Sequence, residues 1–134
     1  MRIEQDGKLD FSDVLIRPKR SNLVSRKDVD LNREYHFKHS NQSWSGVPIM
    51  AANMDGVGTF SMALELQKSN LFTCMVKNYQ VEDYQKQMPN LNTKYFAVST
   101  GTGERDFSNL QQILNVYPEI HFICIDIANG YSEH

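Results

Sequence analysis

The sequence predicts an α/β chain: the N-terminal portion of a (β/α)8 barrel, about four strand–helix units, preceded by an irregular arm with a short hairpin. Three observations predict this class. From Val47 onward, apolar strand candidates alternate with amphipathic helix candidates. The strand candidates are apolar along their whole length, which is typical of parallel strands buried on both faces. They begin about 24 residues apart, and eight such units make a barrel of about 250 residues. A doubly wound open sheet shows the same regularity and stays an alternative.

Residues 1–46 are predicted to form the arm and hairpin, and residues 47–134 the first half of the barrel. The arm is polar, is broken by Pro18, and has one short apolar cluster, FSDVLI, at 11–16. The alternation in YHFK at 35–38 predicts a half-exposed strand. We interpret SNQSWSG at 40–46 as a turn-rich connection.

Strands and helices then follow in order. The expected strands are VPIMAAN at 47–53, LFTCMV at 71–76, YFAVS at 95–99 and IHFICID at 120–126. The expected helices are GTFSMALELQKSN at 58–70, VEDYQKQM at 81–88 and RDFSNLQQILNVYP at 105–118. Thr59 is a candidate N-cap for the first helix, and Pro89 lies just past the end of the second. In each helix the apolar residues recur at helical spacing, so each has one face for the sheet.

The amino-acid composition limits the classes of partner and the cellular compartment that we expect for this chain. The chain has 134 residues, 40% hydrophobic and 22% charged, with a formal net charge of −2, so we expect neither a nucleic-acid nor a membrane partner. Cys74 and Cys124 lie in apolar runs, which predicts buried free thiols in a reducing compartment. The N-terminus shows no signal-peptide pattern, and no apolar run approaches the roughly 20 residues of a membrane span. We therefore expect a cytoplasmic protein.

Polar residues follow every predicted strand, at the edge where barrels carry their sites. They are Asn53 and Asp55, Lys77 and Asn78, Ser99 to Gly101, and Asp126 with Asn129. Lys77 and Asp126 come at the ends of apolar runs, where a charge is costly without a partner. Since the second and fourth strands share one wall of a barrel, we expect the two side chains to be neighbours. They form either a ligand site or a purely structural ion pair.

Other motifs are weaker. GVG at 56–58 and TGTG at 100–103 follow strands and fit tight turns better than phosphate loops, because neither matches a dinucleotide or P-loop pattern. His36 and His39 form an HxxH without a third ligand nearby, so we expect surface histidines and no metal. The early basic residues are either a solvated edge or a contact to phosphate. They are Arg17, Lys19, Arg20, Arg26 and Lys27.

Three segments together resemble the IMP dehydrogenase/GMP reductase family. They are FSDVLIRPKRS at 11–21, VPIMAANMDGVGTFSMA at 47–63 and FICIDIANGYSEH at 122–134. The third is most similar to the reductases, and the resemblance runs from Lys8 to His134. It implies a TIM barrel that uses NADPH for the reductive deamination of GMP to IMP and ammonia, in a protein that is tetrameric by family analogy.

The resemblance also implies roles for particular residues. Ser25 and Arg26 match positions that contact the cofactor of a neighbouring subunit. Lys77 matches a cofactor-contacting lysine near the reacting centre, and Asp126, Ile127 and Ala128 match a third cofactor-contacting stretch. We thus expect Lys77 and Asp126 as supporting catalytic residues. The nucleophilic cysteine of the family matches neither Cys74 nor Cys124, so the 134-residue chain is expected to be inactive alone.

Two departures and two alternatives accompany this interpretation. Gly56 stands where the family usually has threonine, and Asn78 where the reductases often have histidine. An IMP dehydrogenase-type oxidoreductase is one alternative, although residues 79–94 leave no room for the accessory domain that such enzymes often insert there. A half-barrel that serves as an assembly or binding module is the other, because an open sheet has unpaired strand edges.

Overall fold

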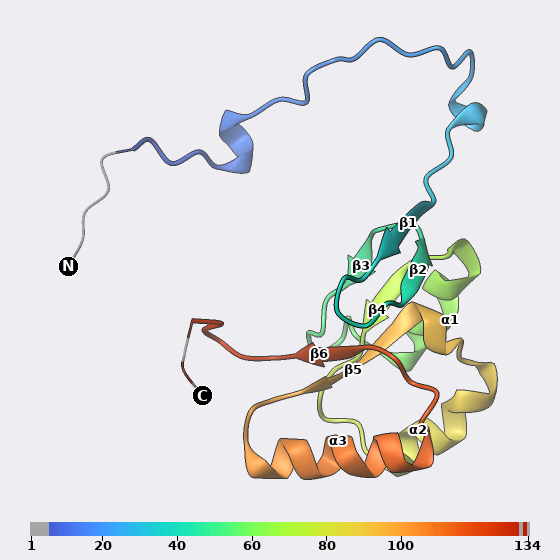
Figure 1. Ribbon diagram of the computed structural model, residues 1–134, viewed down its shortest axis with the longest axis vertical. Helices are drawn as coiled ribbons and strands as arrows, with labels where there is room; N and C mark the ends of the chain where they lie inside the picture. Colours follow the sequence, from blue (N-terminus) through green and yellow to red (C-terminus); the bar gives the residue numbers. More distant parts are fainter. Residues whose placement is uncertain (1–5, 132, 134) are drawn as a thin grey trace. The chain divides into compact units, whose positions relative to one another are not determined.

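The computed structural model describes residues 6–131 and residue 133, and it contains two compact units, which divide between Asp30 and Leu31 (Figure 1). The first unit holds two 3-10 turns, η1 at Phe11–Asp13 and η2 at Arg26–Asp28, joined by extended chain. Asp10 and Ser25 cap them with their side chains. The described residues of this unit are exposed, so local capping rather than a core holds its turns.

The second unit begins with the expected hairpin. Strand β1, Arg33–His36, pairs antiparallel with β2, Ser43–Gly46, with Tyr35 opposite Trp44. The interpretation of SNQSWSG as a connection is therefore wrong for its second half, which is a strand. The alternation of exposed and buried residues in β2 could not be recognised in the sequence, because the second buried residue is Gly46. A Cβ at Gly46 would lie 2.6 Å from the carbonyl oxygen of Asn70. Trp44 is the only large side chain that marks the buried face.

Four parallel strands form the sheet, in the order in which they occur in the chain. They are β3 at Met50–Ala51, β4 at Phe72–Cys74, β5 at Phe96–Thr100 and β6 at Ile123–Ile125. The predicted parallel sheet is thus confirmed. Sequential order, with the helices packed on one face, is the arrangement of a partial (β/α)8 barrel and excludes the doubly wound alternative, in which helices cover both faces.

Three α-helices connect these strands: α1 at Phe60–Leu66, α2 at Val81–Gln87 and α3 at Glu104–Val116. Thr59 caps α1 as expected, since its Oγ1 accepts a hydrogen bond from the Met62 N–H at 3.2 Å. The 3-10 turns η3, η4 and η5 extend the ends of the connections, at Gln67–Ser69, Met88–Asn90 and Thr93–Tyr95. Asn70 ends the α1 connection with a left-handed φ of 59°.

The two middle strands of the sheet, β4 and β5, are buried on both faces by different partners. On one face the helices pack against β5 and the end of β4, in a core formed by Phe60, Ala63, Met75, Tyr84, Phe96, Val98, Leu110, Ile113 and Ile120. On the other face lies a second cluster of Trp44, Phe72, Cys74 and Ala97, with Tyr95, Phe122 and Cys124 beside it. The hairpin supplies Trp44 to this second cluster, so the hairpin covers the face that the helices leave open.

Strand β6 departs from the expectation of burial on both faces. Ile123 and Ile125 are 49% and 64% exposed. They lie opposite Val98 and Thr100 of β5, respectively. Val98 and Thr100 are covered by α3 and its neighbours, whereas no helix of the described residues covers β6 on this face. The prediction of burial on both faces is therefore wrong for β6, because the described residues place no helix over these two side chains.

Tyr84 offers a test of the helix-side core. Its side chain is 1% exposed, and its hydroxyl has no hydrogen-bond partner among the described residues. Because an unpaired buried hydroxyl costs about 1–3 kcal/mol of stability, Tyr84→Phe is expected to leave the free energy of unfolding unchanged or to raise it by about 1 kcal/mol. Tyr84→Ala, which leaves a cavity, is expected to lower it by about 3–5 kcal/mol. Urea denaturation measures the free energy of unfolding of both variants. A Tyr84→Phe variant destabilised by more than about 1 kcal/mol would contradict the conclusion that the Tyr84 hydroxyl is unpaired.

Candidate functional site

Lys77 and Asp126 meet at the carboxyl edge of the sheet. Lys77 Nζ lies 3.7 Å from Asp126 Oδ2, and the two side chains are 39% and 34% exposed. The expected juxtaposition is thus confirmed. Asp126 is fixed by its backbone, since its N–H donates to the carbonyl oxygen of Thr100 at 2.7 Å and so continues the pairing of β6 with β5. The pair is half-exposed, and its separation exceeds that of a close charge-assisted hydrogen bond, which is about 2.7–2.9 Å. Both groups therefore keep capacity for a ligand.

The end of β5 separates Lys77 from Asp126 in the sheet and carries two buried hydroxyls. Ser99 is 4% exposed, and within the part of the chain that the structure describes its Oγ has no hydrogen-bond partner, whereas Thr100 Oγ1 donates to the carbonyl oxygen of Gly101 at 3.1 Å. Ser99 stands in register with Cys124, two residues before Asp126. An unpaired hydroxyl at this position is a polar group that a ligand entering the edge of the sheet would satisfy.

A polar pocket of about 600 Å³ adjoins Lys77. Asn78 and Gln80 line it from the β4 side, and α3 contributes Arg105, Asp106, Ser108, Asn109 and Gln112. Asn109 Nδ2 donates to the carbonyl oxygen of Tyr79 at 3.0 Å, while its buried Oδ1 finds no hydrogen-bond partner in residues 6–131 or residue 133. The residues of α3 were not among those predicted for the site. Their signal was a polar face at helical spacing, opposite the apolar face that predicted the helix.

The other residues that were predicted for the site do not contact the Lys77–Asp126 pair through any hydrogen bond or ion pair among the described residues. Asp55 is exposed in the turn after β3, and Asn129 Oδ1 accepts a hydrogen bond from the Tyr131 N–H at 3.1 Å. Ile127 is 36% exposed and Ala128 is exposed, both directly after Asp126. Ser25 and Arg26 lie in the first unit, where Ser25 Oγ accepts from the Lys27 N–H at 3.3 Å and Arg26 is exposed. Ser132 and His134, at the end of the family-like ANGYSEH segment, lie outside the described residues.

The two cysteines are free and lie in the cluster on the sheet face opposite the helices, which is the inner face of the partial barrel. Cys74 is buried as expected, whereas Cys124 is only half-buried. Burial raises the pKa of the Cys74 thiol to about 12, and the adjacent Cys124 thiol adds to the rise. At neutral pH Cys74 is therefore a neutral thiol, and its contact with Met50 Sδ at 3.8 Å is a packing contact.

Gly56 and Gly58, which follow β3, form a tight turn, as was predicted for GVG at 56–58. Gly56 has a φ of +75°, and the carbonyl oxygen of Met54 accepts from the N–H groups of Val57 and Gly58. A Cβ on Gly58 would lie 2.3 Å from the carbonyl oxygen of Cys74, so the turn packs its backbone directly on β4. The carbonyl oxygen of Gly58 in turn accepts from the Val76 N–H at 2.8 Å. The turn thus holds the segment that leads into Lys77.

His36 and His39 are exposed surface residues, as expected. His36 Nδ1 and Ser43 Oγ are 3.2 Å apart across the hairpin. In the described part of the chain, no three or more His, Cys, Asp or Glu residues are grouped as a metal site would group them. Within the same residues, no helix is both long and apolar enough to span a membrane.

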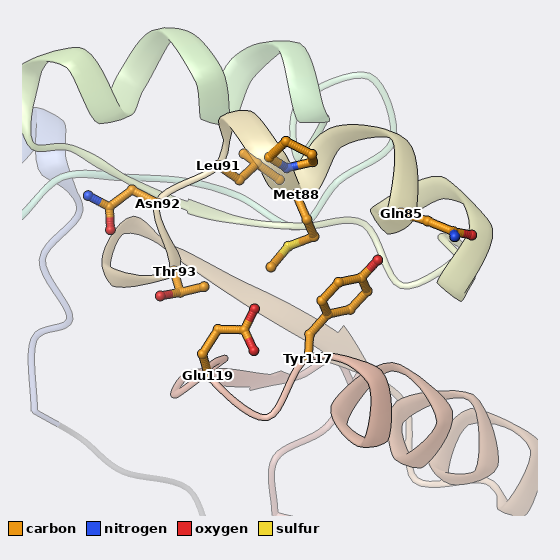
Figure 2. A pocket seen from close by; sticks show the side chains of 8 residues that line it. Gln85, Met88, Leu91, Asn92, Thr93, Tyr117 and Glu119 are labelled. Carbon is orange, nitrogen blue, oxygen red and sulfur yellow. The ribbon is translucent and has the colours of Figure 1, made fainter.

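A further pocket, of about 660 Å³, lies away from these groups, near the N-terminal ends of β5 and β6 (Figure 2). Figure 2 shows Met88 and Tyr117 on opposite sides of it, with Thr93 and Glu119 at its other end. Pro89, Leu91 and Asn92 complete much of the lining. None of the residues predicted for the site lines it, and at the amino edge of a barrel sheet such a pocket is apart from the usual position of the active site.

The fold places this protein in the class of (β/α)8-barrel proteins. A lysine–aspartate pair lies at the carboxyl edge of its sheet. The sequence matches the IMP dehydrogenase / GMP reductase domain over residues 8–134, and the chain belongs to this family. It is 58% identical over 137 residues to the GMP reductases of Shigella boydii serotype 18 and Escherichia coli K12, matching 100% of this chain and 40% of each relative. The chain thus spans about two fifths of the length of the curated relatives it matches.

A solved structure supports the fold. The inosine 5' monophosphate dehydrogenase of Legionella pneumophila superposes with a TM-score of 0.65 at 17% identity, covering 92% of this chain and 36% of that one. At this identity the likeness bears on the fold alone.

Two glycine substitutions test the turn beneath Lys77. Gly58→Ala is expected to lower the free energy of unfolding by about 1–3 kcal/mol, because the methyl group meets the backbone of β4. Gly56→Ala has open space but a left-handed φ, so a cost of about 1–2 kcal/mol is expected. Gly130→Ala, with open space and no positive φ, is the control and should change stability by less than about 0.5 kcal/mol. Chemical denaturation of the three variants decides, and a tolerated Gly58→Ala would refute the close packing of the turn on β4.

Proposed function

We propose that this chain is part of a GMP reductase, an oxidoreductase that uses NADPH to deaminate GMP reductively to IMP and ammonia. The 58% identity to GMP reductases across the whole chain is the observation that carries the proposal. The Lys77–Asp126 pair supports it, because a cation and a carboxylate at the carboxyl edge of a barrel sheet are the groups that such a site needs.

The residues of this edge fit a nicotinamide cofactor. NADPH carries a carboxamide and ribose hydroxyls, which both donate and accept hydrogen bonds, and it supplies the hydride when bound. Lys77 is a donor and Asp126 an acceptor, and their 3.7 Å separation leaves both with unused capacity. In this proposal Lys77 and Asp126 hold and orient the cofactor near the reacting centre, and Ile127 and Ala128 line the same stretch.

Ser25 and Arg26 have a different role in the proposal: they contact the cofactor bound by a neighbouring subunit of a homo-oligomer, which is a tetramer by family analogy. Arg26 is exposed and follows the capping Ser25, so its guanidinium is available to an anionic ligand. The proposal also places the protein in the cytoplasm, where nucleotides and NADPH are found.

The nucleophile of the reaction is not assigned to this chain. The high pKa of Cys74 leaves almost no thiolate at neutral pH, and thiolate is the attacking form. Both cysteines pack in the inner-face cluster, Cys74 among its buried residues with Trp44 and Phe72 and Cys124 beside them. The 134 residues by themselves are therefore proposed to bind ligands without turnover.

A hybrid enzyme tests the function. These 134 residues, joined to the remaining three fifths of the Escherichia coli GMP reductase, are expected to oxidise NADPH in the presence of GMP. Lys77→Ala in the hybrid is expected to lower kcat/KM by about 10²-fold, as loss of a charged group at a reacting centre does. Lys86→Ala, an exposed lysine of α2, is the matched control and should leave the rate unchanged.

Three outcomes would count against the proposal. A hybrid that oxidises IMP with NAD and does not reduce GMP with NADPH would favour the IMP dehydrogenase alternative. An unaffected Lys77→Ala hybrid would remove Lys77 from the site. GMP-dependent NADPH oxidation by the 134-residue chain alone would show that its own residues supply the nucleophile.

One observation favours the assembly alternative: β6 is an edge strand whose Ile123 and Ile125 are 49% and 64% exposed. Exposed apolar edge strands associate. Under this alternative the 134-residue chain self-associates, and Ile125→Lys shifts it toward the monomer in sedimentation velocity measurements. Leu31→Lys, at another exposed apolar residue of the same unit, is the control. A chain that sediments as a monomer at about 100 μM would dismiss this alternative.

A further inference from the structure

Three sulfur-bearing side chains from three strands meet on the inner face of the partial barrel. They are Met50 of β3, Cys74 of β4 and Cys124 of β6. Cys74 Sγ lies 3.8 Å from Met50 Sδ. The thiol of Cys124 is also a hydrogen-bonding neighbour of the Cys74 thiol, and both cysteines are free. Cys74 therefore contacts both of the other sulfur groups.

Strand β5 separates the two cysteines in the sheet but leaves room between their side chains. Cys74 lies opposite Ala97 of β5, and Cys124 lies opposite Ser99, two residues further along that strand. Residues two apart on a strand face the same side of the sheet, and Ala97 belongs to the inner-face cluster with Cys74. Ala97 and Ser99 are both small, so the two thiols approach each other across β5.

Ser99 adds a polar group to this face. Its side chain is 4% exposed, and its Oγ finds no hydrogen-bond partner within the described residues. Because Ser99 lies opposite Cys124, its hydroxyl can donate a hydrogen bond to a thiolate at Cys124. A buried hydroxyl without a partner costs free energy, and a charged sulfur ligand on the same face would supply the partner.

An apolar pocket of about 440 Å³ gives access to the three sulfur groups, which all line it. Met50 is 62% exposed and Cys124 is half-buried, whereas Cys74 is buried. The lining residues of this pocket include no carboxylate and no imidazole. A cation that enters the pocket therefore meets two thiols and a thioether without a competing aspartate, glutamate or histidine.

The separation of Met50 Sδ and Cys74 Sγ fits two ligands of one ion. A metal–sulfur bond is about 2.3 Å long, so two sulfur atoms on one ion are about 3.8–4.0 Å apart in tetrahedral or trigonal geometry. The two atoms already stand 3.8 Å apart. The same separation is by itself an ordinary packing contact. The second thiol, on Cys124, is what turns the pair into a set of three ligands.

A bound cation would also change the protonation of the thiols. Burial and the neighbouring Cys124 thiol raise the pKa of Cys74 to about 12. The rise reflects the cost of a negative sulfur in an apolar setting beside a second one. A metal ion reverses this effect, because its charge compensates the thiolates and a coordinating thiol loses its proton.

We propose that Met50, Cys74 and Cys124 bind one Cu(I) ion. Thiolate and thioether sulfur are the ligands that select this soft cation, whereas Mg²⁺ and Ca²⁺ need oxygen. Binding replaces two S–H bonds by two copper–sulfur bonds and releases two protons to solvent, while the thioether of Met50 binds unchanged. Copper enters and stays as Cu(I), so no electron is transferred. The inference does not depend on the proposed reductase activity, because neither Lys77 nor Asp126 is a ligand.

Anaerobic titration of the 134-residue chain with Cu(I), in competition with the coloured bicinchoninate–Cu(I) complex, measures the site. One equivalent of Cu(I) is expected to move from the chelator to the chain, with a thiolate-to-copper absorption band in the ultraviolet. Cys124→Ser and Met50→Leu are each expected to weaken binding at least tenfold, since loss of a ligand costs no less than the roughly 10–100-fold seen for groups that only support ligands. Neither side chain is fully buried, and circular dichroism checks that both variants fold.

Two control variants separate this site from other copper ligands. Met54→Leu is matched to Met50→Leu, because Met54 is 63% exposed and does not line the pocket. His36→Ala combined with His39→Ala removes the exposed histidines of the hairpin region. Neither control is expected to alter the titration. Loss of Cu(I) binding in the histidine variant would place the ion on the hairpin and overturn the sulfur site.

Three further results would overturn the proposal. The first is a chain with native circular dichroism that takes no Cu(I) from the chelator. The second is a folded Cys124→Ser variant that binds Cu(I) as tightly as the unchanged chain. The third concerns the class of ion: Zn²⁺ prefers four nitrogen or sulfur ligands, so an equimolar amount of Zn²⁺ is expected to leave Cu(I) bound, and displacement of Cu(I) would refute a site for a soft cation.

Discussion

Burial of both faces of a short parallel sheet is the constraint on which the rest of this structure depends. Parallel strands with apolar residues on both sides are stable only when each side is covered. Helices α1, α2 and α3 cover one side, and their core includes Tyr84, Phe96 and Ile113. The other side is covered at its amino end by the hairpin, through Trp44, which packs edge to face on Phe72 and Tyr95. The hydrogen bond from its indole N–H to Lys94 prevents the cost of a buried unpaired donor.

This division makes the two ends of the sheet chemically different. At the amino end, aromatic side chains pack around Trp44 on the face of the sheet opposite the helices. At the carboxyl end the described residues form no such aromatic cluster, and polar groups gather there. Lys77 and Asp126 are tolerated at this end because they are about one third exposed and oppose each other's charge. The turn at Gly58 sets the position of Lys77, since its backbone packs on the last residues of β4.

The sequence predicted the elements whose two-sided apolar pattern or helical period was strong. It also predicted the neighbourhood of Lys77 and Asp126, because the order of strands in a barrel follows the order in the chain. It did not predict β2, since the buried face of Ser43–Gly46 consists of one tryptophan and one glycine. The exposure of Ile123 and Ile125 was also unpredictable, because a residue's own pattern does not reveal whether its cover is present. The polar face of α3 was missed, since surface polarity alone does not distinguish a pocket from solvent. The cofactor roles of Ser25, Arg26, Ile127 and Ala128 stay predictions.

Cys74 shows how the inner face constrains the chemistry open to these residues. A cysteine acts as a nucleophile only as thiolate, and a thiolate needs water, a cation or a helix N-terminus near it. Cys74 has instead Met50, Cys124 and the apolar cluster around it, and its pKa rises accordingly. The burial of Cys74 on this face of the sheet thus keeps its thiol in the neutral form. At the carboxyl edge, where the strands end and the sheet meets water, the described residues offer a half-exposed cation and carboxylate, Lys77 and Asp126, whereas the thiol of Cys74 at the end of β4 is buried.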